Sequence, residues 1–318
     1  MVEVYKFVDG AITRIDDVED DCWVTVVSPT PEEREWLSTQ LGVVPEFATA
    51  SLDDEEHPHV DYDEDERQTL IIVDCPFIED RAETMDSSIT QYDTHPLSIV
   101  MLPKRKILVT VSLRYNDIIQ QVVKRRVRSE RDERHPKILL DMLMKIARTY
   151  LAALRDIDRQ YKANERVLRA HMRNAELIKM LGLEKSLVYF STSLRSFELV
   201  LTKLSNGRLV RFSDDDAELL EDVFVEVRQA TEMCDISQKI LNESMDAFSN
   251  IISNNMNYTI SRLTIITLVL AVPTIVFSFY GMNTATLPLV DTWLAPLGIA
   301  AALCILTAVI FMKGKFLK

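Results

Sequence analysis

The sequence predicts an α+β membrane protein with an N-terminal α/β head, a long helical stalk and two C-terminal transmembrane helices. Three observations predict this fold class. Residues 1–128 alternate short β-type runs with acidic, turn-rich stretches. No Gly or Pro interrupts the chain between Ser213 and Pro273. Residues Leu263–Tyr280 and Trp293–Met312 carry no charge, and each can span a hydrocarbon core of about 30 Å.

The charge is distributed unevenly along the chain. The formal net charge is −13, yet residues 1–100 hold 26 acidic and 5 basic residues, a net charge of −21. Such a head repels nucleic acid and attracts divalent cations, so we expect no nucleic-acid partner. Four scattered cysteines without a CxxC pair indicate neither a zinc–thiolate site nor a disulfide framework. The first residues lack the pattern of a cleavable signal, and we expect the head to lie in the cytoplasm.

Within the head, a helix is expected over Pro31–Gly42, because Pro favours a first helical turn and Gly a helix end. Another is expected over Asn116–Arg128. Four apolar, β-branched runs predict strands of a mostly antiparallel or mixed sheet: Cys22–Val27, Thr69–Val73, Leu97–Leu102 and Lys106–Ser112.

From Pro136 onwards the apolar residues recur at helical spacing. We expect a break near Leu181-Gly182-Leu183 and a second helix that ends near Ser205, before the Asn206-Gly207 turn. Ser213 then caps the longest element, because three aspartates follow it in the first turn. A continuous helix from Ser213 to Tyr280 would be ~100 Å long.

Two stripes run along this predicted helix. One is a heptad-like apolar packing seam that runs from Leu220 to Ile252. The other stays polar or small as it enters the membrane, which is costly for a helix surrounded by lipid. Pore lining is the interpretation we favour, and a polar contact between helices is the alternative. The second stripe begins at Glu243, and its pore-lining candidates are Asp246, Asn250, Ser253, Asn257, Ile260, Thr264, Thr267, Ala271, Thr274 and Ser278.

The topology follows from the basic residues that flank the two spans. Arg262 precedes the first span, whereas Lys313, Lys315 and Lys318 follow the second. The link over Gly281–Thr292 has no Lys or Arg. The positive-inside rule therefore places both termini in the cytoplasm of a multi-pass protein of the plasma or inner membrane.

The stretch Asn257–Thr267, Pro273-Thr274 and Tyr280-Gly281-Met282-Asn283 resembles the CorA family of magnesium channels and transporters. That family combines an acidic cytoplasmic head, a very long stalk helix, two membrane helices and a Gly-Met-Asn signature at the outer end of the first. The four features occur here in this order, so the resemblance covers the whole chain. Residues Leu183–Leu194 also resemble a helix of one bacterial branch.

The resemblance implies a homopentameric funnel whose selectivity filter is Tyr280, Gly281, Met282 and Asn283. Five copies of Asn283 would bind Mg²⁺ in its water shell. Gly281 is read as allowing a close approach or an unusual turn at the helix end, or as an ordinary helix-ending glycine. Alignment on Asn283 also places family pore positions on Thr274, Asn257 and Asp246, and a regulatory metal ligand on Asp222. Ile260, with Leu263, would form an apolar constriction.

Three departures from the family pattern concern regulation and outer ion capture rather than the pore. The outer loop Thr284–Asp291 has Asp291 as its sole carboxylate, the segment Arg159–Arg173 is basic, and the C-terminal tail has three lysines rather than a dense cluster. Residues Asp53–Glu66 hold nine carboxylates and two histidines, and we favour a solvated loop over a metal site. The basic run Lys124–Arg128 is read as an exposed helix rather than a lipid contact.

No phosphate loop, nucleophile elbow or catalytic triad is evident, so we expect no enzyme and no organic cofactor. We expect passive influx of hydrated Mg²⁺, with Co²⁺ or Ni²⁺ as possible substitutes. Internal Mg²⁺ is expected to close the pore. The expected partners are further copies of the chain, membrane lipid and divalent cations. The alternatives are a membrane-anchored divalent-ion sensor or scaffold, and a transporter of another metal such as zinc. The expected segments are a head (1–130), a helical hairpin (131–212), a stalk (213–258), a first span (259–281), an outer loop (282–292), a second span (293–313) and a tail (314–318).

Overall fold

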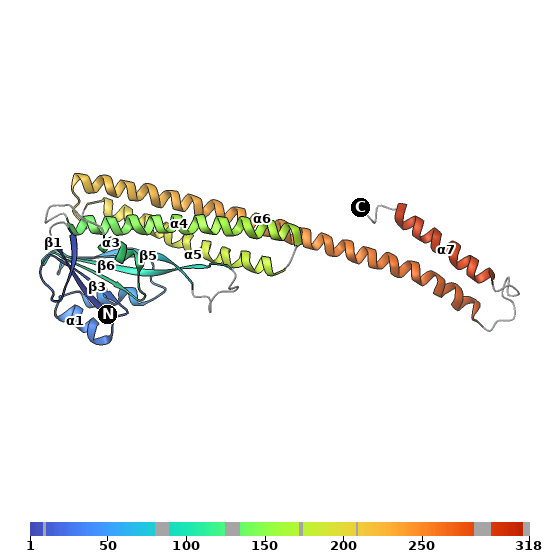
Figure 1. Ribbon diagram of the computed structural model, residues 1–318, viewed down its shortest axis with the longest axis horizontal. Helices are drawn as coiled ribbons and strands as arrows, with labels where there is room; N and C mark the ends of the chain where they lie inside the picture. Colours follow the sequence, from blue (N-terminus) through green and yellow to red (C-terminus); the bar gives the residue numbers. More distant parts are fainter. Residues whose placement is uncertain are drawn as a thin grey trace. The chain divides into compact units, whose positions relative to one another are not determined.

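The computed structural model describes residues 1–8, 11–79, 89–124, 134–171, 174–207, 209–282 and 294–313. The chain divides into two compact units, Met1–Glu243 and Ser244–Lys318. The first unit holds the sheet and most of the helices, and the second holds the apolar helices (Figure 1).

The head contains a mixed seven-stranded sheet, as the sequence predicts. The strand order is β2-β1-β3-β7-β6-β5-β4, and only the β3–β7 pair is parallel in the described sheet. The four predicted strands are β3 (Cys22–Val27), β5 (Gln68–Ile78), β6 (Tyr92–Leu102) and β7 (Ile107–Ser112), of which β5 and β6 are longer than expected. Prediction missed β1 (Val2–Val8), β2 (Ala11–Ile15) and β4 (His59–Asp63).

One face of the sheet is covered by α1 (Pro31–Thr39), α2 (Pro45–Thr49) and the short turn η1 (Ala50–Leu52) (Figure 1). Helix α1 begins with a capping box, in which the Thr30 hydroxyl accepts from the Glu33 amide and the Glu33 carboxylate accepts from the Thr30 amide. Leu37 and Phe47 belong to the same buried hydrophobic cluster as Val24 and Val109 of the sheet. The helix predicted over Pro31–Gly42 is therefore confirmed, with Gly42 in the left-handed region at φ +73°.

The opposite face is covered by α3 (Asp117–Val123), α4 (Arg134–His171) and α5 (Asn174–Ser205) (Figure 1). Trp23 is fully buried there and donates its indole N–H to the Thr110 hydroxyl at 3.1 Å. The Tyr150 hydroxyl of α4 donates to the Asp74 carbonyl of β5 at 3.1 Å. The sheet is thus enclosed between two helical layers, which is how a half-apolar sheet buries both faces.

The break expected near Gly182 is wrong, because α5 runs through that residue without interruption. Gly182 instead allows Ile89 and Gln91, which precede β6, to lie close against α5. A Cβ built on Gly182 would lie 2.6 Å from the Gln91 Nε2 atom and 2.9 Å from Ile89 Cδ1. Helix α4 ends at His171 and α5 begins at Asn174, about ten residues before the expected break.

The acidic segment 53–66 is not a simple loop, because residues His59–Asp63 form edge strand β4. Its turn is closed by the Asp63 carboxylate, which accepts from the Glu66 amide at 2.7 Å. Charged side chains on an edge strand keep it from pairing with other sheets. In the described parts of the chain no three His, Cys, Asp or Glu side chains are placed to share a metal ion.

The remaining elements are α6 (Asp214–Tyr280), which is 67 residues long, and α7 (Leu294–Lys313). Helix α6 confirms the predicted uninterrupted stalk and first span, and it contains Pro273 near its end. The predicted helix over Asn116–Arg128 is described only to Lys124, so most of the basic run Lys124–Arg128 lies outside the described residues.

Candidate pore-lining helix

Helix α6 begins at the cap that the sequence predicts. The Ser213 hydroxyl accepts from the Asp216 amide at 3.3 Å, and the Asp216 carboxylate accepts from the Ser213 amide at 3.4 Å. This reciprocal pair satisfies two backbone donors that a helix start leaves unpaired. The carboxylates of Asp214 and Asp215 also lie at the positive end of the helix dipole.

The apolar seam fixes α6 to the rest of the first unit. Leu220, Val227, Cys234 and Leu241 are at most 5% exposed. The Cys234 thiol lies 3.4 Å from the Leu187 carbonyl oxygen of α5. Two ion pairs flank the seam, Arg148–Glu226 at 3.4 Å and Arg195–Asp235 at 3.1 Å. The seam is therefore a packing face, as its heptad spacing predicts.

The polar stripe of α6 remains uncovered in the single chain. Nine of its ten pore-lining candidates are exposed and Ala271 is half-buried. Ile260 is 53% exposed and the adjacent Leu263 is 64% exposed. The exposed nine are Asp246, Asn250, Ser253, Asn257, Ile260, Thr264, Thr267, Thr274 and Ser278.

Helix α7 packs on a different face of α6. The Cys304 thiol lies 3.5 Å from the Val269 carbonyl oxygen, and Val276 and Ala300 are 7% and 4% exposed. Val269, Val272, Val276 and Tyr280 recur every three or four residues on this covered face, and each is half-buried or buried. At about 100° per residue, that row lies on roughly the opposite side of the helix from Thr264, Thr267, Ala271, Thr274 and Ser278. The polar stripe is therefore not a contact surface for α7.

The threonine hydroxyls of the stripe bond within their own helix. Thr264 donates to the Ile260 carbonyl at 2.9 Å, Thr267 to Leu263 at 2.8 Å and Thr274 to Leu270 at 3.3 Å. Each donor is thereby satisfied, which a helix in a membrane requires. The oxygen lone pairs stay available to accept hydrogen bonds. Such a row suits the outward-pointing hydrogens of water around a cation.

The end of α6 differs from one of the expectations for Gly281. Its amide donates to the Phe277 carbonyl at 2.9 Å, which continues the helix, and its backbone is not left-handed. The described backbone therefore has no unusual turn at Gly281 itself, and the chain beyond Met282 lies outside the described residues. A Cβ at Gly281 would lie 3.2 Å and 3.5 Å from the Phe277 and Ser278 carbonyl oxygens of its own helix, which are the neighbours of any residue that continues a helix. Met282 is 54% exposed, and Asn283 lies outside the described residues, as do Asp291 and the outer loop.

The two acidic positions assigned to metal binding, Asp222 and Asp246, both lie on exposed faces of α6. Among the residues that the structure describes, no cluster of three potential metal ligands includes either of them. At either position the structure therefore shows a single exposed carboxylate, to which Mg²⁺ could bind only with water or other copies of the chain supplying its remaining oxygen ligands.

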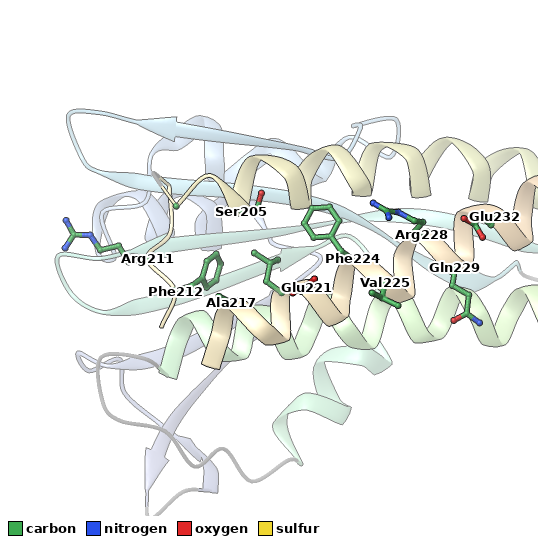
Figure 2. Close-up of a pocket in the computed structure, with 12 residues that line it drawn as sticks. Ser205, Arg211, Phe212, Ala217, Glu221, Phe224, Val225, Arg228, Gln229 and Glu232 are labelled. Atoms are coloured by element: carbon green, nitrogen blue, oxygen red, sulfur yellow. The ribbon is translucent and has the colours of Figure 1, made fainter. Parts of the chain in front are cut away.

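A cavity of ≈ 1030 Å³ opens where the chain enters α6. Figure 2 shows Glu221, Phe224, Arg228 and Glu232 projecting from successive turns of α6, with Phe212 on the segment before it. The lining mixes both charges with apolar groups, and Val225 is 61% exposed. Prediction missed this cavity, although two of its lining residues, Leu220 and Phe224, belong to the apolar seam. Val225 lies on a different face of α6, which it shares with Ile236 and Ile240, and these two are 60% and 46% exposed.

Two described helices are long and apolar enough to cross a membrane. They are the C-terminal part of α6 and residues Leu294–Phe311 of α7, and only 6% of each apolar window is buried. A core helix of a soluble protein would be mostly buried, so the exposure of both windows favours a lipid environment.

Comparison with known proteins agrees with this architecture. The chain is 27% identical over 298 residues to the cobalt/magnesium transport protein CorA of Methanocaldococcus jannaschii, covering 89% of this chain and 88% of that protein. The complete structure of the CorA magnesium transporter from the same organism superposes with a TM-score of 0.79 at 26% identity, covering 98% and 96% of the two chains. The full-length CmaX protein shares the fold with a TM-score of 0.70 at 16% identity, covering 98% of this chain and 96% of that one.

The model of the CorA-like Mg²⁺ transporter family matches residues 19–313, which include most of the head, the whole of α6 and α7. The resemblance noted from the sequence is thereby confirmed, and so is the membrane-protein fold class with its two C-terminal apolar helices. This chain belongs to the CorA-like Mg²⁺ transporter family.

Proposed function

We propose that five copies of this chain surround a central pore in the cell membrane and conduct hydrated Mg²⁺ into the cytoplasm. The observation that carries the proposal is the exposed polar stripe of α6 on the side opposite α7. A polar row that faces lipid is costly, whereas the same row around a shared axis faces water. The stripe from Asp246 to Ser278 is then the pore lining, and Ile260 with Leu263 forms its apolar constriction.

The filter of this pore is Tyr280-Gly281-Met282-Asn283, with the five Asn283 amides at the outer mouth. Mg²⁺ releases its water slowly, so a ring of neutral amide oxygens can bind the hydrated ion without holding it. A carboxylate ring would bind the ion more tightly and slow its release.

Inward flow needs no nucleotide. With both termini in the cytoplasm, each charge of the ion gains about 2.3 kcal/mol per 100 mV of inward-negative potential. The segments 1–130, 131–212 and 213–258 are then cytoplasmic head, hairpin and stalk, 259–281 and 293–313 are the spans, and 282–292 and 314–318 are the outer loop and the tail.

Internal Mg²⁺ closes the pore by bridging acidic surfaces of neighbouring copies. Asp222 is the ligand that we assign on α6, and its exposure leaves it accessible to another copy. When Mg²⁺ is scarce, repulsion between the carboxylates loosens the heads and favours conduction. Self-association is supported by Val225, Ile236 and Ile240, large apolar side chains exposed along α6.

Mg²⁺ is the preferred cargo, and Co²⁺ or Ni²⁺ passes as an octahedral mimic. The related protein of Methanocaldococcus jannaschii is named for both cobalt and magnesium. Zinc transport is less well supported, because residues 258–303 contain no His or Cys. A membrane-anchored sensor would leave the polar stripe without a function, since α7 does not cover it.

Growth of a cell that lacks magnesium uptake tests this proposal. The chain restores growth at low Mg²⁺, and Asn283→Ala abolishes the rescue at equal expression. Asn206→Ala, in an exposed turn before α6, is the matched control and rescues normally. Equal rescue by Asn283→Ala would exclude the amide ring as the filter.

A further inference from the structure

A second cavity, of ≈ 490 Å³, lies at one end of the head sheet. Four segments meet there: the β4–β5 turn, the β6–β7 turn, the first turn of α4 and the segment before α6. The Thr69 hydroxyl donates to the Leu209 carbonyl at 3.0 Å, which ties the last of these segments to the sheet. The volume falls in the range of small-molecule sites, about 300–1,000 Å³.

The charges that line this cavity oppose the charge of the head. Arg67, Lys106 and Arg211 line it, and no carboxylate is among its described lining residues. The adjacent Glu66 is already paired with Lys104 at 2.7 Å. Residues 1–100 carry a net charge of −21, so the composition of the head does not explain why all the charged side chains that line this cavity are cationic. Figure 2 shows the Arg211 side chain extending away from Phe212 and from the side chains of α6.

Two of these cations occupy an unusual backbone conformation. Arg67 has φ +56° and Lys106 has φ +54°, and each is the last residue of its hairpin turn. Glycine adopts the left-handed region at no steric cost, whereas other residues are uncommon there. Strained positions of this kind concentrate at functional sites. Both turns therefore bear a long cationic side chain where a glycine would fold more readily.

The start of α4 adds to the positive character of the site. Helix α4 has 38 residues, and His135 and Pro136 in its first turn line the cavity. The positive end of the helix dipole lies at this turn. His135 is 7% exposed, and its Nε2 atom has no hydrogen-bond partner within the described structure. The imidazole packs edge-on against Phe7, with 6.0 Å between the ring centroids, so His135 helps to form the wall without offering this atom to a ligand.

The remaining walls are apolar. Tyr62, Met101 and Pro103 line the cavity beside the cations, and Tyr62 is 37% exposed. A flat aromatic ring next to an arginine offers a surface for a planar organic group. One guanidinium group can bind two oxygens of a phosphate at once, through two parallel N–H···O hydrogen bonds.

We propose that this cavity binds a phosphate-bearing organic anion of nucleotide size. Arg67 and Arg211 hold the phosphate, and the planar part of the ligand lies against Tyr62 and Met101. The site is separate from the polar stripe of α6, so this inference does not depend on the proposed pore. It gives the head a ligand other than a divalent cation.

The test is calorimetric titration of the full-length, detergent-purified protein with ADP in EDTA, which removes Mg²⁺. We expect saturable binding that Arg67→Ala and Arg211→Ala each weaken about tenfold or more, the loss of a charge-assisted contact of about 1.5–3 kcal/mol. Arg195→Ala removes an exposed cation outside the cavity and leaves the affinity unchanged. Thermal unfolding of each variant shows that the fold is retained.

Titration with inorganic phosphate distinguishes the two sources of phosphate. The proposal expects it to bind at least tenfold more weakly than ADP, because it cannot use the apolar wall. Three outcomes overturn the proposal: no binding of ADP at millimolar concentration, equal affinity for inorganic phosphate, or ADP binding that is indifferent to both arginine substitutions.

Discussion

The Cys304 thiol of α7 lies 3.5 Å from the Val269 carbonyl oxygen of α6, whereas Thr267, two residues earlier, projects from the other side of the same helix. One face of α6 is thus covered by α7, and the face with the hydroxyls is left free. This division is the physical basis of the proposed pore, because only the free face can be shared with other copies of the chain.

Thr267→Val should slow Mg²⁺ uptake while leaving the fold unchanged. Valine has the same shape, and the lost hydroxyl donates only to the Leu263 carbonyl of its own helix. The substitution removes a hydrogen-bond acceptor for the water shell of the ion. The loss of about 1 kcal/mol of stabilisation raises the free-energy barrier to conduction, which corresponds to a roughly fivefold lower rate. The measurement is Mg²⁺ influx into proteoliposomes that hold a fluorescent indicator.

Thr307→Val is the matched control for that substitution. Thr307 lies on α7 and donates to the Leu303 carbonyl at 2.7 Å, so the chemical change is the same at a position outside the stripe. Its uptake rate should equal that of the parent. A similar loss of rate in both variants would attribute the effect to helix stability rather than to pore lining.

Gly182→Ala should destabilise the head. The new Cβ would lie 2.6 Å from the Gln91 Nε2 atom, which is buried, so the side chain or the helix must move. Overpacking of this kind lowers the free energy of unfolding by about 1–3 kcal/mol, and each kcal/mol lowers the melting temperature by roughly 2–4 °C. Gly298→Ala is the control, since nothing lies within 4 Å of a Cβ added at that position. An unchanged melting temperature in Gly182→Ala would show that this contact is not tight.

Asp74 should make the stability of the head dependent on pH. It is 8% exposed on β5, its carboxylate accepts from the Ser193 hydroxyl of α5, and burial raises its pKa from 3.8 to about 6. An acid whose pKa is higher in the folded state binds its proton more tightly when folded. The fold therefore loses stability as the pH rises from about 4 to about 6, and by pH 7 the cost is about 3 kcal/mol.

Asp74→Asn removes this pH dependence, because an amide keeps the acceptor for Ser193 and carries no charge. Melting temperatures between pH 5 and pH 8 should fall with rising pH in the parent by more than in the variant. At pH 7 the variant should be the more stable of the two. A variant that melts lower than the parent at pH 7 would mean that the charged carboxylate is stabilising.

The sequence predicts the elements whose patterns are local and long. The cap at Ser213, the apolar seam and the two C-terminal apolar helices follow from spacing and composition, and the structure contains each of them. Strands β1, β2 and β4 were missed because their own patterns are short or highly charged, and β1 also pairs with a strand further along the chain. The predicted helix break at Gly182 was wrong because glycine occurs both where helices end and where a neighbouring chain approaches a helix closely. Only the position of Gln91 in the structure distinguishes the two cases.

The candidate site could likewise be predicted only in part. The polar stripe could be drawn from periodicity, but its freedom from α7 required the positions of Val269 and Cys304. The cationic cavity could not be predicted, because Arg67, Lys106 and Arg211 come from segments far apart in the sequence. The role of Asn283 stays a prediction, since that residue lies outside the described part of the chain.

Cysteine accessibility along α6 tests the central claim most directly. Single cysteines are introduced on the two faces of the helix and treated in membranes with a charged thiol reagent that cannot enter lipid. The positions are Thr264, Thr267, Ala271, Thr274 and Ser278 on the polar row, and Val269, Val272 and Val276 on the row under α7. The account predicts that modification follows the polar row with helical periodicity, spares the row under α7, and blocks Mg²⁺ uptake. Equal modification of both rows, or none at Thr267 and Thr274 while the protein transports, would contradict it.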